Sequence, residues 1–395
     1  MNRGEIIFYS LAIASLGCHC HPFLGFQSIH IPLMRFSPVR VLSTPHSGWL
    51  ECWEPDDLLL LRKITRRLQP RIQAAPSRNC FHLKGHGGAK GALQATRRLL
   101  DTRRYSFVAR SDAKGYYANI RHRILLAQVR EHCDHSPTLR LVQQYCARTL
   151  VKDGYYHEVE RKGISLGCPL SPLMGALYLS PLDKALENLP GVKYLRFMDD
   201  WIILAESRWK LRRAVRIMNQ VLADLELDQH PDKTFIGKVS CGFDFLGVDF
   251  HPEKKDKPHL VSCKPSRVSK ERLQEKLQKH FTHAARLYEQ GRLKSLETIE
   301  QYLSHWLRWS KGIGIALPNA LDTIKRSLNE LCEETTDAMI PTFIQAMKAW
   351  MKTQEIQHEK DIINRSMPSP KESVSYFTCS LSNPISNGGR NSPHC

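Results

Sequence analysis

The sequence predicts an α+β protein in which a sheet-forming region is followed by a helical one. Two apolar segments, 192–197 and 201–205, flank the acidic pair Asp199-Asp200, a pattern typical of an antiparallel hairpin with carboxylates at its tip. Residues 265–330 instead carry apolar side chains at helical spacing. A hairpin-forming region with a helical region behind it indicates the α+β class.

Composition restricts the function before any motif is considered. The chain has 395 residues and a formal net charge of +18, with 42% hydrophobic and 24% charged residues. This length is ample for a large core, and the composition excludes wholesale disorder and an integral membrane protein. The basic excess favours a polyanionic partner, most commonly nucleic acid. Twelve cysteines without a C-x-x-C pair predict neither a zinc ribbon nor a dithiol redox site, and they favour a reducing, cytoplasmic location.

The remaining elements follow from periodicity and turn signals. In chain order they are a basic helical region at 50–104 interrupted by a glycine-rich segment, a strand at 105–112, helices at 121–129 and 136–150, a short strand at 155–160, a loop at 163–172, a helix at 171–188, a helix at 208–226 and a strand pair at 233–250.

Both ends of the chain differ from the rest. Residues 6–18 form an apolar run of signal-peptide length, too short to span a bilayer. This run suggests either a secretory or lipoprotein-type signal or an upstream start codon, with translation beginning nearer Met34. From about residue 363 the chain is rich in Ser, Pro and Asn, and we expect it to be disordered.

Three aspartates carry the main chemical signal. Adjacent carboxylates at Asp199 and Asp200 repel each other, and neither lies at a helix start that would stabilise it. Divalent cations relieve such repulsion, and Mg²⁺ prefers carboxylates, water and substrate phosphates. Asp112, at the end of a predicted strand, is the candidate for a third carboxylate. From these residues alone, a metal site and a simple Asp-Asp turn with a capping Asp both remain open.

Five segments in order resolve this ambiguity. They are Asp112-Ala-Lys-Gly-Tyr-Tyr-Ala-Asn-Ile-Arg-His122, Gly163-Ile-Ser-Leu-Gly-Cys-Pro-Leu-Ser-Pro172, Tyr194-Leu-Arg-Phe-Met-Asp-Asp200, Lys233-Thr234 and Gly242-Phe-Asp-Phe-Leu-Gly247. Together they resemble the successive motifs of reverse transcriptases of the bacterial group II intron and retron type.

The resemblance implies a right-hand polymerase with fingers, an antiparallel-sheet palm and a helical thumb. It divides the chain into an N-terminal extension (1–49), fingers and palm (50–250), a thumb (251–335) and a C-terminal extension (336–395).

The resemblance also assigns roles to individual residues. Asp112, Asp199 and Asp200 become the catalytic carboxylates that bind two Mg²⁺ ions, for which Mn²⁺ can substitute. Tyr117 takes the place of an aromatic residue beneath the incoming sugar, where its ring would clash with a 2′-OH; a plainly packed aromatic is the alternative. Lys233 matches a lysine near the departing pyrophosphate, and its alternative is a solvated lysine.

Four further residues are predicted to bind substrate. Leu166 and Gly167 occupy the loop in which the family usually has a glutamine that contacts the incoming nucleotide. Leucine cannot donate that hydrogen bond, so nucleotide positioning must differ. In the family's frame, Lys84 and Lys90 lie in the fingers, where they could hold template phosphates. Their glycine-rich segment lacks the Gly-Lys-Ser/Thr ending of a nucleotide-hydrolase loop.

The predicted function is therefore RNA-directed DNA synthesis, in which a DNA or RNA primer 3′-OH is extended with dNTPs on an RNA template by two-metal phosphoryl transfer. A dedicated structured RNA is a possible partner, no membrane is expected, and the biological role is in a mobile element or antiviral defence. The alternative, supported by Leu166, is a catalytically weak nucleic-acid-binding relative. A third reading, a secreted or lipid-anchored basic protein, rests on residues 1–20 alone.

Overall fold

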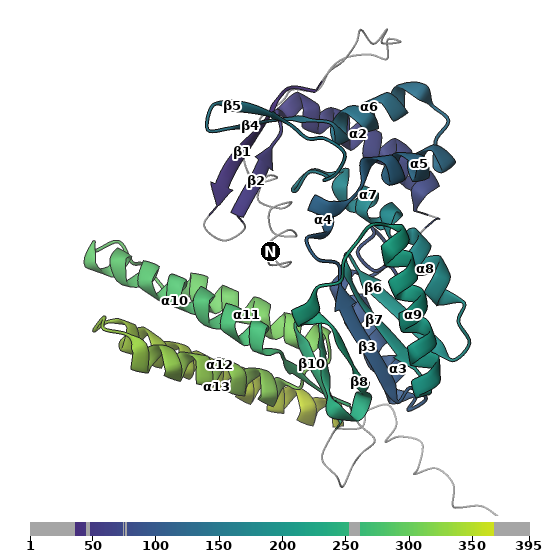
Figure 1. The fold of residues 1–395 in the computed structure, drawn as a ribbon. Helices are drawn as coiled ribbons and strands as arrows, with labels where there is room; N and C mark the ends of the chain where they lie inside the picture. The colour runs from purple at the N-terminus through teal and green to yellow at the C-terminus, as the bar shows by residue number, and fades with distance from the viewer. Residues whose placement is uncertain (1–35, 45–47, 74, 76, 253–260, 367–395) are drawn as a thin grey trace, which may run out of the picture. The chain divides into compact units, whose positions relative to one another are not determined.

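The computed structural model describes residues 36–44, 48–73, 75, 77–252 and 261–366 (Figure 1). The chain forms two compact units. The first contains the chain up to residue 272 together with 306–323, and the second contains 273–305 and the chain from 324 onward. The apolar run at 6–18 and the Ser/Pro/Asn-rich tail beyond residue 366 lie outside the described residues, so both expectations remain predictions.

The central sheet of the first unit is antiparallel and has the order β6-β7-β3-β8. Its strands are β6 (Val192–Phe197), β7 (Asp200–Ala205), β3 (Phe107–Asp112) and β8 (Phe235–Lys238). The predicted hairpin is confirmed as β6 and β7, and the predicted strand ending at Asp112 is confirmed as β3. Strand β7 is apolar and buried on both faces from Trp201 to Ala205, as an interior strand between packed helices must be.

Three helices pack on the central sheet. They are α3 (Gly88–Asp101), α8 (Ser180–Glu187) and α9 (Arg208–Asp224). Helix α9 begins because the Ser207 hydroxyl accepts a hydrogen bond from the Lys210 backbone N–H, and it buries a stripe that includes Leu211 and Met218. The indole N–H of Trp201 on β7 lies 3.1 Å from the Met218 sulfur, which places that face of the sheet against α9.

A second sheet and its helices form the upper part of this unit in Figure 1. Its strands are β1 (Val39–Thr44), β2 (Gly48–Cys52), β4 (Thr149–Lys152) and β5 (Tyr155–Glu158), in the order β2-β1-β4-β5. The accompanying helices are α2 (Pro55–Ile72), α4 (Tyr116–Asn119), α5 (His122–His132), α6 (Ser136–Cys146) and α7 (Ser171–Tyr178).

The helix predicted at 171–188 is two helices, and that part of the prediction was wrong. Helix α7 ends at Tyr178 and α8 starts at Ser180. Pro181 explains the break, since it has no N–H to donate to the Leu177 carbonyl and its ring would clash with that carbonyl.

The rest of the chain is a small sheet and a set of helices. Two single 3₁₀ turns, η1 (Pro231–Lys233) and η2 (Val239–Cys241), lead into β9 (Phe243–Phe245), β10 (Val248–Pro252) and β11 (Val261–Pro265), which pair antiparallel in the order β11-β10-β9. Helices α10 (Arg267–Glu289), α11 (Glu297–Gly312), α12 (Leu317–Glu334) and α13 (Ile340–Ser366) follow. The helical character predicted for 265–330 is thereby confirmed.

Candidate active site

The three predicted carboxylates lie at one end of the central sheet. Strands β6 and β7 are joined by the two-residue turn Met198-Asp199, in which Met198 has a left-handed φ of 60°. Asp200, the first residue of β7, is the register partner of Asp112 on β3. The backbone N–H of Ala113 donates to the Asp199 carbonyl at 3.3 Å, which ties the turn to the end of β3. Sheet register therefore brings together acids that are 87 residues apart in sequence (199 − 112).

A cavity of about 370 Å³ opens at this end of the sheet. Its lining comes from four separate stretches of the chain and includes Asp112, Tyr117, Leu166, Met198, Asp199 and Lys233. Five of these were singled out from the sequence: Asp112, Tyr117, Leu166, Asp199 and Lys233. Asp200 does not line the cavity itself but is paired in register with Asp112, which does.

Lys233 is held at the cavity by an ion pair. Its ammonium nitrogen lies 3.1 Å from Oδ2 of Asp112, and the Asp112 side chain is buried. The 3₁₀ turn that begins at Pro231 carries this lysine, and the preceding His230 donates its backbone N–H to the Asp112 carbonyl at 3.0 Å. Burial of a carboxylate is costly unless a cation is close, so Lys233 offsets that cost and directs a positive charge into the cavity.

Tyr117 packs its ring against helix α7 beside the cavity. A methyl group at Gly175 would lie only 3.0 Å from Cε1 of Tyr117, so glycine is required for this close approach. Among the described residues, nothing hydrogen-bonds the buried Tyr117 hydroxyl. Burial, reinforced by the charge of Asp199, raises the pKa of Tyr117 and keeps the phenol neutral.

The loop with Leu166 and Gly167 is anchored to Tyr117. The Ile164 N–H donates to the Tyr117 carbonyl at 2.9 Å, so the loop and the ring are positioned together. Leu166 faces the cavity. Gly167 has a φ of 83°, which favours glycine, and it is exposed outside the lining.

Lys84 and Lys90 are not brought to the cavity. Both are exposed, and α3, which begins two residues before Lys90, packs against β6 of the central sheet. The Lys90 side chain lies alongside Gly312 at the end of α11. The Phe81 backbone N–H donates to the Arg196 carbonyl of β6 at 2.7 Å, which holds this segment beside the central sheet. The assignment of the segment to the fingers stays a prediction.

The donor set at the cavity suits a hard divalent cation. Asp112 and Asp199 both line the cavity, with Asp200 adjacent, and carboxylate oxygen is the ligand that Mg²⁺ and Mn²⁺ prefer. As the side chains stand, within the part of the chain that the structure describes, no three His, Cys, Asp or Glu residues converge into a complete metal cluster. The Lys233 ammonium occupies the position beside Asp112 instead.

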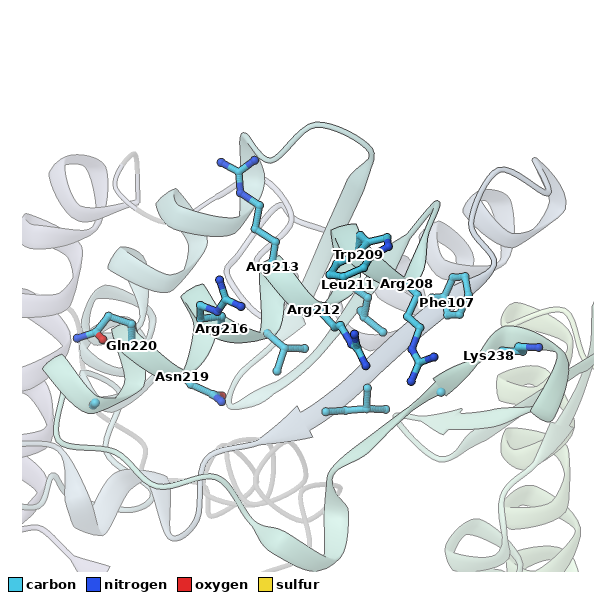
Figure 2. A pocket seen from close by; sticks show the side chains of 14 residues that line it. Phe107, Arg208, Trp209, Leu211, Arg212, Arg213, Arg216, Asn219, Gln220 and Lys238 are labelled. Carbon is cyan, nitrogen blue, oxygen red and sulfur yellow. The ribbon is translucent and has the colours of Figure 1, made fainter.

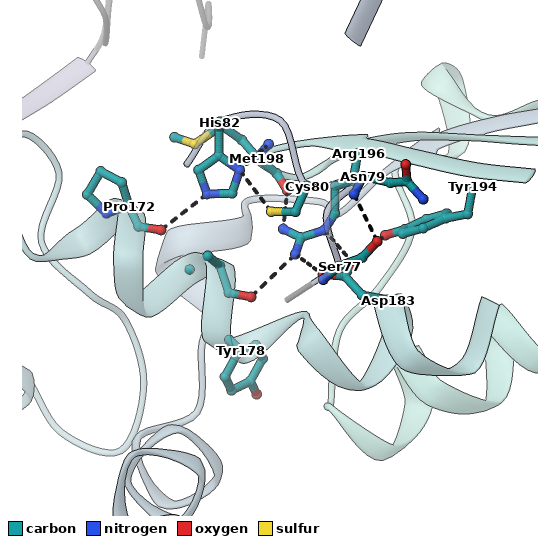
Figure 3. Close-up of polar contacts among 12 residues, drawn as sticks. Ser77, Asn79, Cys80, His82, Pro172, Tyr178, Asp183, Tyr194, Arg196 and Met198 are labelled. Atoms are coloured by element: carbon teal, nitrogen blue, oxygen red, sulfur yellow. Dashed lines mark hydrogen bonds and ion pairs between the residues drawn. The ribbon is translucent and has the colours of Figure 1, made fainter. Parts of the chain in front are cut away.

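A buried ion pair, Arg196–Asp183, supports the Met198-Asp199 turn, which we call the acidic turn (Figure 3). The Arg196 guanidinium forms two parallel hydrogen bonds to Asp183, Nε to Oδ1 at 2.7 Å and Nη2 to Oδ2 at 2.5 Å, and neither side chain has exposed surface. Arg196 Nη1 also donates to the Met198 carbonyl at 2.9 Å. Burial acts to lower the pKa of Arg196, but Asp183, Cys80 and Tyr194 together outweigh it, so the pKa is raised well above its usual value and the guanidinium stays charged.

His82 also hydrogen-bonds the acidic turn, through the backbone of Met198. The Met198 N–H donates to His82 Nδ1 at 3.0 Å, so Nε2 carries the proton and donates to the Pro172 carbonyl at 3.2 Å. No role for His82, Arg196 or Asp183 was predicted from the sequence. A charge inside the apolar strand 192–197 was a usable signal for Arg196, but its partner could not be read from the sequence.

We predict that His82 makes the protein acid-sensitive. Removal from water, aided by the nearby Arg196 charge, lowers the pKa of His82 to about 3, whereas the unfolded chain has a value near 6.5. Below pH 6.5 the unfolded state therefore binds a proton that the folded state does not, and stability is lost as pH falls toward 3.

His82→Asn is the matched variant, because its amide oxygen can still accept from Met198 but does not titrate. Chemical denaturation at pH 7 and pH 4.5 should show a smaller loss of stability in His82→Asn than in the wild type. Equal losses in the two proteins would contradict the prediction.

The antiparallel sheet, the acidic turn and the mixed helix and sheet content define an α+β polymerase fold. Residues 58–250 match the family model described as reverse transcriptase (RNA-dependent DNA polymerase). This region is therefore similar to the reverse transcriptase domains that the family model describes.

Solved structures of two telomerases are similar to the chain. The apo telomerase of Candida tropicalis matches at 13% identity and a TM-score of 0.48, with 82% of this chain and 61% of that chain covered. A form of it truncated from the C-terminal domain matches at 14% identity and a TM-score of 0.42, with 52% of this chain and 45% of that chain covered.

The telomerase of Candida albicans, in complex with a fragment of telomeric RNA, matches at 12% identity and a TM-score of 0.45, with 80% of this chain and 66% of that chain covered. The chain thus spans between 45% and 66% of the length of these telomerase chains.

None of the curated proteins matches the sequence. Within the described ranges, no helix is both long and apolar enough to cross a bilayer.

Proposed function

We propose that this protein is an RNA-directed DNA polymerase of the group II intron or retron type, which extends a DNA or RNA primer with dNTPs on an RNA template. The observation that supports it best is the single cavity that gathers Asp112, Tyr117, Leu166, Asp199 and Lys233 from separate segments. Each is a position that the motif resemblance singled out independently. We also propose that a dedicated structured RNA is the natural partner.

In this proposal the chain's own residues position the reactants. Asp112, Asp199 and Asp200 would hold two divalent cations, Mg²⁺ or Mn²⁺, whose charge would lower the pKa of the primer hydroxyl and neutralise the departing pyrophosphate. Lys233 is released from Asp112 when other positive charge balances that carboxylate, and its ammonium is then available for a substrate phosphate. Leu166 contacts the nucleotide by packing, since it cannot donate a hydrogen bond.

The test is primer extension on poly(rA)/oligo(dT) with Mg²⁺ or Mn²⁺. The Asp199→Ala/Asp200→Ala variant is the negative control. Incorporation of dTTP by the wild type alone supports the proposal. Tight RNA binding without incorporation, with either ion and with the cognate RNA supplied, would instead support the nucleic-acid-binding alternative.

Tyr117 yields a prediction about sugar selectivity. If its ring lies beneath the incoming sugar, Tyr117→Ala removes the clash with a 2′-OH, and the preference for dTTP over UTP should fall about tenfold or more, the scale of one lost steric contact. Tyr117→Phe keeps the ring and should keep the preference, because the hydroxyl makes no hydrogen bond within the described residues. Competition between dTTP and UTP in primer extension measures the effect, and unchanged selectivity in Tyr117→Ala would assign the ring to packing alone.

A further inference from the structure

A second, larger hollow lies between helix α9 and the edge strand β8. It has a volume of about 1310 Å³ and shares no lining residue with the candidate active site. Figure 2 shows the side chains of Arg208 and Arg212 lying between α9 and β8, with Lys238 farther along β8. We call this hollow the α9–β8 groove.

The groove exists because α9 covers only part of the sheet. The helix packs on β6, β7 and β3, and among the described residues no helix packs closely over this face of β8, the edge strand. Ile236 of β8 therefore remains 53% exposed beside Phe107 of β3, and Gly237 adds no side chain. An apolar floor open to water at a sheet edge is a feature that native proteins usually cover.

The walls of the groove carry positive charge without a compensating acid. Its charged lining consists of Arg208, Arg212, Arg213, Arg216 and Lys238, and the lining contains no Asp or Glu. Arg208, Arg212 and Arg216 follow one another at four-residue spacing, so they form a row that rises about 6 Å per step. Within the described residues these five side chains make no ion pair. Such a row matches a chain of phosphates better than a single anion.

An exposed aromatic ring accompanies the cations. Trp209 is 77% exposed, and the Arg212 guanidinium lies 5.5 Å from the centre of its ring. Rings flanked by basic side chains stack on unpaired bases, a mode available to single strands but not to a closed duplex. Asn219 and Gln220 line the groove one turn beyond Arg216. The Asn219 amide oxygen accepts from Gln229 and the Gln220 amide donates to Asp224 at 3.0 Å, and each amide keeps a further donor and acceptor for a ribose 2′-OH.

We propose that the α9–β8 groove binds a single-stranded segment of RNA, outside the candidate active site. The phosphates would lie along the arginine row, and a base would stack on Trp209. The choice of RNA rests on the proposed function as well as on the amide side chains, whereas the existence of the site rests on the groove alone.

The test measures binding of fluorescein-labelled oligo(U) RNA to the full chain by fluorescence anisotropy, between 50 and 200 mM salt. Trp209→Ala should weaken binding about tenfold, while Trp209→Phe should largely restore it. Arg212→Ala/Arg216→Ala should reduce the slope of log K against log salt by about 1.4, or 0.7 for each charge. Arg130→Ala/Arg140→Ala removes the same charge from exposed positions outside both cavities and should leave the slope unchanged.

The outcomes separate this inference from the proposed function. Unchanged affinity and slope in the groove variants would overturn the inference even if primer extension succeeds. Loss of oligo(U) binding in those variants would support it even if the wild type fails to incorporate dTTP. Equal affinity for oligo(dU) DNA would overturn the assignment to RNA. If poly-glutamate displaces the RNA and Trp209→Ala has no effect on binding, the groove binds an acidic protein and the inference is overturned. All these side chains are exposed, so unchanged unfolding midpoints will verify that the variants fold.

Discussion

Replacing Asp199 and Asp200 together by alanine is expected to reduce dTTP incorporation at least about 10³-fold. Removing one pre-positioned electrostatic group from an active site typically costs 10²–10³ in rate, and this variant removes two of the three predicted carboxylates at this end of the central sheet. Asp112 would remain, but Lys233 already pairs with it, so little negative charge would be left to bind cations.

Two controls make this result specific. Asp232→Ala removes an exposed carboxylate next to Lys233 that does not line the cavity, and it should keep near wild-type activity. The double variant should also fold and bind RNA normally, because removing adjacent like charges relieves repulsion. If its activity stays within tenfold of the wild type, the carboxylates are not the catalytic groups.

Arg196→Met is expected to destabilise the first unit by about 3–5 kcal/mol, because it leaves the fully buried Asp183 carboxylate without its cation. The remaining partners of Asp183, the Tyr194 hydroxyl at 3.0 Å and the Ser77 N–H at 3.2 Å, are neutral and cannot replace that charge. The loss also frees the Met198 carbonyl, so the turn that carries Asp199 should become less ordered. Urea denaturation measures the loss.

Two matched variants distinguish the effect of breaking a buried ion pair from the effect of breaking an exposed one. Arg71→Met breaks an exposed pair with Asp134 and should leave the unfolding midpoint unchanged. Arg196→Met/Asp183→Leu removes both charges and should be more stable than Arg196→Met alone, since no buried charge is left unpaired. A double variant as unstable as the sum of the single variants would contradict this account.

Much of the central architecture could be predicted from local pattern. The two apolar segments on either side of Asp199-Asp200 predicted the β6–β7 hairpin, and the strand ending at Asp112 was predicted with its last residue correct. The α+β polymerase class followed from the ordered motifs and is confirmed. These features depend on residues adjacent in sequence, where periodicity and turn chemistry are informative. The catalytic and binding roles assigned to individual residues stay predictions.

What local pattern could not predict was which distant segments meet. Backbone hydrogen bonds between residues 79–81 and Arg196 hold the segment with Lys84 and Lys90 beside the central sheet, a pairing that the spacing of that segment does not indicate. Nothing in the spacing of His82 indicates that its ring accepts the Met198 N–H, because the two residues are 116 apart in the chain.

By itself, the sequence determined the order of the five motif segments, the fold class and the basic character of this protein, because each depends on neighbouring residues or on composition. Only the tertiary structure decided that Lys233 neutralises Asp112, that Arg196 and Asp183 form a buried support for the acidic turn, and that α9 leaves β8 uncovered beside a row of arginines. These are contacts between segments far apart in the chain. Sheet register and helix packing create them, and the periodicity of a single segment carries no information about its partner.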